Sequence, residues 1–225
     1  MRATIAREVL VELARLDGSR VAVGTVFCIG RNVFAHALEL GNEVPDEPLV
    51  FLKSAGAVRP LDATGVIAFP DETFHHEAEV VVVVGEPVPL GAKVGWEVVE
   101  GVALGLDLTR RQVQSALKAK GHPWVLAKSF QGAAPVGPVV PLARFADPGA
   151  IRFTLHVDGE LRQSGDLRGL SFPIPELLTR LAALQPLVPG DIVFTGTPAG
   201  VADLRVGQPF VLAFEEPALE FAGRL

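Results

Sequence analysis

A chain of 225 residues, 49% hydrophobic and 20% charged, is long enough to bury a substantial core as one large domain or two small ones. The formal net charge is −6 and no basic cluster occurs, which argues against a nucleic-acid partner and against an anionic membrane surface. No run approaches the roughly 20 apolar residues of a membrane span, and no apolar signal region follows Met1. The single cysteine, Cys28, cannot form an intramolecular disulfide, so we expect a cytoplasmic protein.

Short strands separated by turns are predicted for the first half of the chain, in keeping with its 23 glycines and 18 prolines. A short helix is predicted over residues 34–40 and would end at Gly41. Residues 1–25 are expected to form a brief N-terminal β region before the main domain over residues 26–225. Strands are predicted over residues 9–16, 21–29, 49–53 and 66–69.

Longer elements are predicted from residue 77 onward. Five consecutive valines, 80–84, predict a buried strand, and residues 98–108 predict another. Thr109 is a candidate N-cap for a helix over 109–120, and Asp158-Gly159 indicates a hairpin turn. Because strands dominate, we predict a curled mixed β fold rather than a doubly wound sheet. The remaining elements are strands over 152–157, 161–164, 191–195 and 210–214, and a helix over 176–184.

Two carboxylates, Glu77 and Glu79, stand at the start of the valine strand. Alternate residues of a strand point to one side, about 6.6 Å apart along the backbone. Like charges on a buried strand repel each other, so a cation between them is expected, and oxygen ligands suit Mg²⁺ or Mn²⁺. The alternative is a polar strand end that faces water. Relief of this repulsion predicts that Glu77→Ala melts at a higher temperature in the absence of metal.

Asp107 follows an apolar strand and is a candidate third ligand, although it could instead stabilise the N-terminus of the next helix. His36 and Glu39, at i and i+3 of the first helix, could form a water-activating pair or an ordinary surface contact. Lys128 lies between apolar neighbours, and it is either an ion-pair partner or an anchor for a substrate carboxylate. The turn over residues 195–200 could bind an oxyanion or be purely structural.

A series of short motifs runs in a fixed order along nearly the whole chain, from about Phe27 to Phe214. The series resembles the fumarylacetoacetate hydrolase family, most closely its short acylpyruvate hydrolase and oxaloacetate decarboxylase branch. It is also similar to the bacterial isomerase and decarboxylase enzymes of homoprotocatechuate breakdown. The motifs are Gly30-Arg31-Asn32, His36-x-x-Glu39, Phe51-Leu52-Lys53, His76-Glu77-x-Glu79, Asp107-x-Thr109, Lys128-Ser129-Phe130, Asp158-Gly159-Glu160, Gly190-Asp191 and Thr195-Gly196-Thr197-Pro198.

The resemblance implies an α+β, mostly β fold, a β-sandwich roll with few short helices that holds Mg²⁺ or Mn²⁺ in a cleft. It also implies roles for nine residues: Glu77, Glu79 and Asp107 as metal ligands, His36 and Glu39 as a water-activating pair on a mobile lid, and Arg31, Gln114, Lys128 and Thr197 as contacts to substrate oxygens. The chain departs from the family pattern at Val33, where an aromatic residue is usual, and across Leu167-Arg168-Gly169-Leu170. These departures weaken the inference about the substrate.

The function implied is a metal-dependent hydrolase that cleaves a carbon–carbon bond in a small 2,4-dioxo acid of the acylpyruvate type, with oxaloacetate decarboxylation as a further activity. One alternative is the isomerase or decarboxylase of aromatic catabolism that acts on 2-hydroxyhepta-2,4-diene-1,7-dioate or 5-carboxymethyl-2-oxo-hex-3-ene-1,7-dioate. Another is a non-catalytic binding protein on the same fold, which the His36–Glu39 pair and the three acids disfavour. The resemblance and a mean hydropathy of +0.36 predict a homodimer.

Overall fold

The computed structural model describes residues 11–33, 46–62 and 67–225. His36, Glu39 and the helix predicted over residues 34–40 lie outside these ranges. The described chain is mostly β, with three short α-helices, as the sequence predicts. No helix in the described ranges is long and apolar enough to cross a membrane. The helices are α2 (Arg111–Ala119), α3 (Val125–Lys128) and α4 (Ile174–Leu184).

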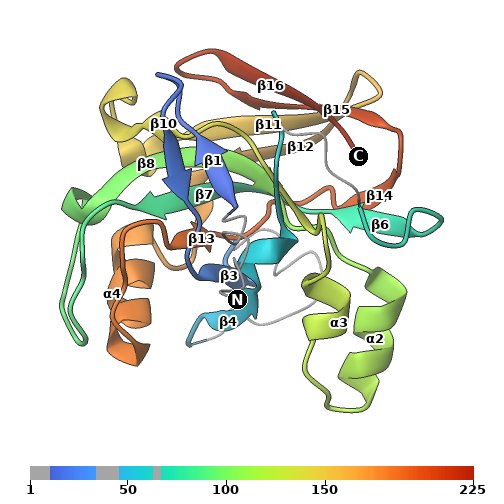
Figure 1. Cartoon of the computed structure of the whole chain (residues 1–225), viewed down its shortest axis with the longest axis horizontal. Coiled ribbons are helices and arrows are strands. Elements are labelled where there is room, and N and C mark those ends of the chain that lie inside the picture. Colours follow the sequence, from blue (N-terminus) through green and yellow to red (C-terminus); the bar gives the residue numbers. More distant parts are fainter. Residues whose placement is uncertain (1–10, 34–45, 63–66) are drawn as a thin grey trace, which may run out of the picture.

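Two larger sheets form the body of the molecule (Figure 1), and the four-stranded sheet lies across one side of the central sheet. In Figure 1, α4 lies at the left of the central sheet, and α2 and α3 lie at its right. The central sheet has the order β4 (Leu49–Lys53), β3 (Val26–Gly30), β13 (Ile192–Phe194), β7 (Ala78–Val84), β8 (Val99–Leu106), β9 (Ala134–Val136) and β5 (Val58–Pro60), with β10 (Val140–Pro141) paired to β8. The second sheet has the order β12 (Glu160–Asp166), β11 (Arg152–Val157), β15 (Pro209–Phe214) and β16 (Leu219–Arg224).

Two small ribbons complete the fold. One pairs β1 (Glu12–Ala14) with β2 (Arg20–Ala22), and the other pairs β14 (Ala202–Arg205) with β6 (Thr73–His76). The second ribbon ends one residue before Glu77, so it places the start of β7 beside the loop that precedes β14.

The valine run is buried on both faces of β7, which explains why it lacks polar alternation. Val80, Val82 and Val84 belong to a hydrophobic cluster that includes inward residues of the four-stranded sheet. Val81 and Val83 belong to a second cluster, on the side of Leu13 and the residues of β3. The strand that carries Glu79 is therefore fixed by packing from both sides, which holds the carboxylate in a defined position.

Several element boundaries differ from the sequence-based expectation. The run 21–29 is broken into β2 and β3, because the side chain of Asp191 accepts a hydrogen bond from the Thr25 amide at 2.7 Å. Thr109 is not a helix cap: its backbone pairs with His75, and α2 begins two residues later. The described part of the predicted strand 66–69 contains no strand. The hairpin turn is as predicted, with Asp158 at φ 52° and Gly159 at φ 81°.

Candidate active site

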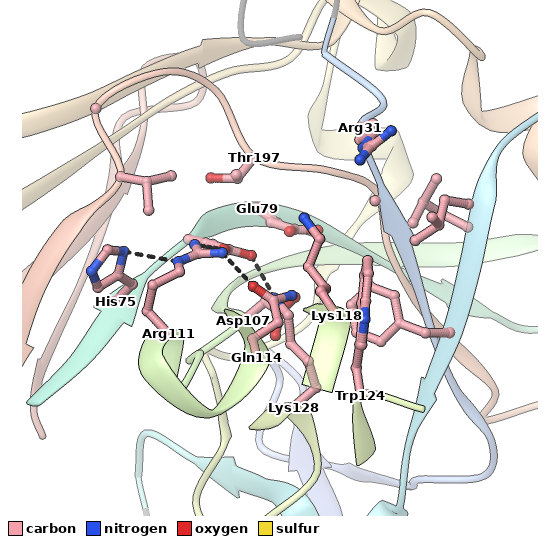
Figure 2. Close-up of a pocket in the computed structure, with 17 residues that line it drawn as sticks. Arg31, His75, Glu79, Asp107, Arg111, Gln114, Lys118, Trp124, Lys128 and Thr197 are labelled. Atoms are coloured by element: carbon pink, nitrogen blue, oxygen red, sulfur yellow. Dashed lines mark hydrogen bonds and ion pairs between the residues drawn. The ribbon is translucent and has the colours of Figure 1, made fainter. Parts of the chain in front are cut away.

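A cavity of about 690 Å³ opens beside the start of β7, and Figure 2 shows its polar lining. The side chains come from β3, β4, the β6–β7 junction, the end of β8, the helices α2 and α3, and the loop that follows β13. Of the residues singled out from the sequence, the cavity brings together Arg31, Glu77, Glu79, Asp107, Gln114, Lys128 and Thr197.

Neighbouring antiparallel strands bring the three carboxylates together. The register of β7 against β8 places Glu79 opposite Gly105, and the Asp107 amide donates to the Glu77 carbonyl at 2.8 Å. One carboxylate oxygen from each of Glu77, Glu79 and Asp107 lies within 4.8 Å of the others. Glu79 and Asp107 are only 3% and 2% exposed. Three carboxylates at this separation in a buried site need positive charge to balance them.

Two lysines and an arginine supply part of that balance. The ammonium of Lys128 donates to Glu77 Oε2 and to Asp107 Oδ2, both at 2.7 Å. Lys53, which is fully buried, lies 2.8 Å from Asp107 Oδ1. The guanidinium of Arg111 pairs with Glu77 Oε1. Sequence reasoning predicted Lys128, but it noted Lys53 only as the end of a short strand and as part of the motif Phe51-Leu52-Lys53, and gave it no role.

The pKa values of the paired groups follow from these contacts. Burial opposes ionisation of Glu77, but the charges of Lys128 and Arg111 outweigh it and lower the Glu77 pKa to about 2. Burial likewise opposes the charged form of Lys128, but Asp107 and Glu77 outweigh it and raise its pKa above the usual value. Glu77 is therefore an ionised, well-paired carboxylate. The expected relief of repulsion on removing Glu77 does not follow from this structure.

Glu79 is different, because no lysine or arginine pairs with it within the described ranges. It accepts a hydrogen bond from the Gly196 amide at 2.7 Å. Burial and the charge of Asp107 raise its pKa well above the ordinary value, against the effect of that hydrogen bond. A divalent cation would remove this penalty, and carboxylate oxygens are hard ligands with lone pairs to spare. The donor set therefore fits Mg²⁺ or Mn²⁺.

A hydrogen-bond network behind the carboxylates fixes the loop that follows β13. Gln163 Oε1 accepts from the Ala78 amide at 2.9 Å and lies 2.9 Å from His76 Nδ1, which must therefore carry the proton. Gln163 Nε2 donates to Thr197 Oγ1 at 2.8 Å, and Thr197 donates to the Ala78 carbonyl at 3.0 Å. Sequence reasoning missed Gln163. Gln163 lies in the strand predicted over residues 161–164, but nothing in its local sequence marks it as buried, and only the packing of β12 shows its role.

The rim of the cavity is cationic and aromatic. Arg31 has φ 60°, a left-handed backbone conformation that is uncommon for non-glycine residues. Arg111 Nε donates to His75 Nδ1 at 3.1 Å, so Arg111 joins His75 to Glu77. Gln114 is buried and accepts from Arg111. Lys118 and Trp124 also line the cavity, although sequence reasoning singled out neither of them.

Comparison with known proteins identifies the family. A sequence model described as "Fumarylacetoacetate (FAA) hydrolase C-terminal" matches residues 25–222. The chain belongs to the fumarylacetoacetate hydrolase family. It is 38% identical over 184 residues to an Arabidopsis thaliana protein named oxaloacetate tautomerase FAHD1, mitochondrial, and the match covers 81% of this chain and 82% of that protein. It is 36% identical over 186 residues to a Dictyostelium discoideum protein named oxaloacetate decarboxylase, mitochondrial, covering 81% and 85% of the two chains.

Solved structures agree with this assignment. The crystal structure of fumarylpyruvate hydrolase from Pseudomonas aeruginosa in complex with Mn²⁺ and pyruvate superposes with a TM-score of 0.89, at 35% identity, covering 99% of this chain and 98% of that one. The family, the fold and the enzyme class predicted from the sequence are confirmed by these similarities.

The two departures from the family motifs lie next to each other in the structure. Val33 forms an isolated antiparallel bridge with Leu170. The adjacent Asn32 carbonyl accepts from the Ser171 amide at 2.7 Å. The two changes therefore belong to one structural unit and are coupled by contact.

Proposed function

We propose that this enzyme binds one divalent cation, Mg²⁺ or Mn²⁺, through Glu77, Glu79 and Asp107, and acts on a small 2-oxo acid. The observation that carries the proposal is the group of three buried carboxylate oxygens within 4.8 Å, one of which, on Glu79, has no basic partner in the described chain. The cation, when bound, would polarise the substrate oxygens as a Lewis acid. The main reaction proposed is hydrolysis of the carbon–carbon bond of an acylpyruvate.

The substrate contacts assigned to this chain are Arg31, Gln114, Lys128 and Thr197. Each of them lines the same cavity as the three acids, which supports the assignment. Lys128 is held between Glu77 and Asp107, so its charge is fixed at the inner end of the cavity. Arg31 lies at the outer end of β3 and would contact the substrate from the rim. Water activation by His36 with Glu39 stays a prediction, since both lie outside the described residues.

A second candidate is decarboxylation or tautomerisation of oxaloacetate. The names of the relatives favour it, because several similar proteins are called oxaloacetate tautomerases and one is called an oxaloacetate decarboxylase. A third, isomerisation in aromatic catabolism, is supported by a 25% identical structure named 5-carboxymethyl-2-hydroxymuconate delta-isomerase, with a TM-score of 0.74. All three reactions use a 2-oxo acid, so a binding measurement cannot distinguish them and the reaction products must be identified.

The test is a product screen with metal-free protein reconstituted with Mg²⁺ or Mn²⁺. Acetylpyruvate should give pyruvate and acetate, whereas oxaloacetate should give pyruvate and carbon dioxide if it is decarboxylated, or only a keto–enol change if it is tautomerised. Glu79→Gln should abolish the metal-dependent activity, while Glu86→Gln, a change at an exposed carboxylate outside the cavity, should retain it. Absence of turnover of every substrate with either metal, or turnover unaffected by chelation, would contradict the proposal.

We also infer a homodimer. Leu52, Val125 and Leu126 are 49%, 55% and 66% exposed, and β4, which carries Leu52, ends the path of the described central sheet. Apolar groups beside a sheet edge are suitable for burial against a second copy. The valine strand does not contribute, because it is buried within the chain. Sedimentation equilibrium should give twice 23.8 kDa, and Leu52→Lys should weaken the association; a fully active 23.8 kDa species would contradict the inference.

We infer that residues 1–25 form a short N-terminal β region and residues 26–225 the catalytic domain. Leu13 of the first region shares a hydrophobic cluster with residues of β3.

We infer a cytoplasmic location from Cys28, a buried free thiol suited to a reducing compartment. Several relatives are named as mitochondrial proteins, so fractionation of the source cells is the deciding measurement.

A further inference from the structure

Helix α2 presents a polar stripe to the cavity. Arg111, Gln114 and Lys118 stand at i, i+3 and i+7, which places them on one face of the helix, and all three line the cavity. The first two have partners, because Arg111 pairs with Glu77 and His75, and Gln114 accepts from Arg111. Lys118 is the one member of the stripe with no ion pair or hydrogen bond from its ammonium within the described ranges.

Lys118 is nevertheless directed into the cavity. Its ammonium lies 5.7 Å from the centre of the Trp124 ring, a contact that orients a lysine side chain at modest energy. Figure 2 shows Lys118, Trp124 and Arg31 on one side of Glu79 and Asp107, and Arg111 and His75 on the other. The stripe therefore carries one cation that is paired with the carboxylates, Arg111, and a second that is available to a ligand, Lys118, from a residue about two turns or roughly 10 Å further along the helix axis.

The basic side chains near the carboxylates already have partners. Lys53, Lys128 and Arg111 pair with Asp107 and Glu77, so these cations have partners before any substrate arrives. Lys118, an exposed residue that lines the cavity, adds a positive charge that no described carboxylate neutralises. An anionic group at the far end of the substrate would supply that partner.

We propose that Lys118 binds the distal carboxylate of a dicarboxylate substrate and so makes the enzyme prefer diacids to monoacids of equal length. The inference rests on the proposed function, in which the inner end of the cavity holds the 2-oxo acid group. Lys118 is then a specificity-determining residue, distinct from the residues that contact the reacting atoms.

The test uses two seven-carbon acylpyruvates that differ only at the end far from the 2-oxo acid group. Succinylpyruvate has a second carboxylate there, and butyrylpyruvate has a methyl group. Wild-type enzyme loaded with Mn²⁺ should prefer succinylpyruvate in kcat/KM. Lys118→Met keeps the side-chain length without the charge and should reduce that preference about tenfold, the size of one charge-assisted hydrogen bond. Lys118→Arg, which keeps the positive charge, should retain most of the preference for succinylpyruvate. Lys120→Met, a change on an exposed lysine that does not line the cavity, is the matched control.

A binding measurement separates this inference from the proposed reaction. 2-Oxopimelate and 2-oxoheptanoate have the same length but lack the second carbonyl, so they cannot be hydrolysed as acylpyruvates. By calorimetry with Mn²⁺-loaded protein, 2-oxopimelate should bind more tightly, and Lys118→Met should remove the difference. If neither acylpyruvate reacts, the proposed hydrolysis fails while the calorimetric pair still decides the role of Lys118. Equal affinities in the wild type, or a preference that survives Lys118→Met, would overturn the inference.

Discussion

Removal of the charge on Glu77 should destabilise the metal-free protein. The structure pairs this carboxylate with Lys128 at 2.7 Å and with Arg111, and these charges lower its pKa from 4.5 to about 2. At about 1.4 kcal/mol for each tenfold change in the protonation equilibrium, this lowering of the Glu77 pKa corresponds to about 3 to 4 kcal/mol of stability. Glu77→Gln keeps the shape but leaves Lys128 buried with one carboxylate fewer, so a loss of about 3 kcal/mol is expected at pH 7.

The sign of the pH dependence follows from the direction of the shift. Because the folded-state pKa of Glu77 is lower than its unfolded value, its contribution is fully present above about pH 4.5 and is lost as the pH falls toward 2. Glu77→Gln should therefore show less acid destabilisation than the wild type over this window. The difference between the two proteins should be largest near neutral pH.

Glu79→Gln is the matched control, since it makes the same chemical change two residues away. Burial and Asp107 raise the pKa of Glu79, so a neutral isostere there should leave the metal-free protein as stable as the wild type or more stable. Urea unfolding in the presence of EDTA, followed by circular dichroism, gives the three free energies. If Glu77→Gln were as stable as the wild type, or if Glu79→Gln were the less stable variant, the assignment of charge pairs would be refuted.

Three other changes test separate parts of the account. Lys53→Met should cost about 3 kcal/mol or more in urea unfolding, because it leaves Asp107 buried with one partner fewer; an unchanged midpoint would contradict the ion pair. Gln163→Leu leaves the Ala78 amide without its acceptor, so it should lower the free energy of unfolding by about 2 kcal/mol and also raise KM. A loss of stability with an unchanged KM would show that Gln163 has no link to substrate binding. His36→Ala should lower hydrolysis roughly 100-fold and decarboxylation less, and equal small losses would remove its role in water activation.

That the three acids lie together could be predicted from the sequence, because the signal is local. Glu77 and Glu79 lie two apart beside a valine run, and Asp107 ends the next apolar strand, so period-two alternation and strand pairing were enough to bring them together. The partners of these acids were harder to predict. Lys53 meets Asp107 across 54 positions, and Gln163 meets Ala78 across 85, so only the packing of β4 and β12 against the site reveals them.

Contacts between residues far apart in the sequence explain the errors in the predicted element boundaries. The apolar pattern from 21 to 29 suits one strand, but Asp191 binds the Thr25 amide and separates β2 from β3. Thr109 has the residue type of a cap, yet its backbone is used in pairing with His75. In both cases the local signal was real, and a contact from a remote part of the chain changed the outcome.

The central claim is that Glu77, Glu79 and Asp107 together hold one divalent cation. The most direct measurement is a titration of metal-free protein with Mn²⁺, in which free Mn²⁺ is quantified by electron paramagnetic resonance. The wild type should bind one Mn²⁺ per chain, and Glu79→Gln should bind none at the same concentrations while staying at least as stable as the wild type in EDTA. Absence of binding to the wild type, or equal binding by Glu79→Gln, would contradict the claim.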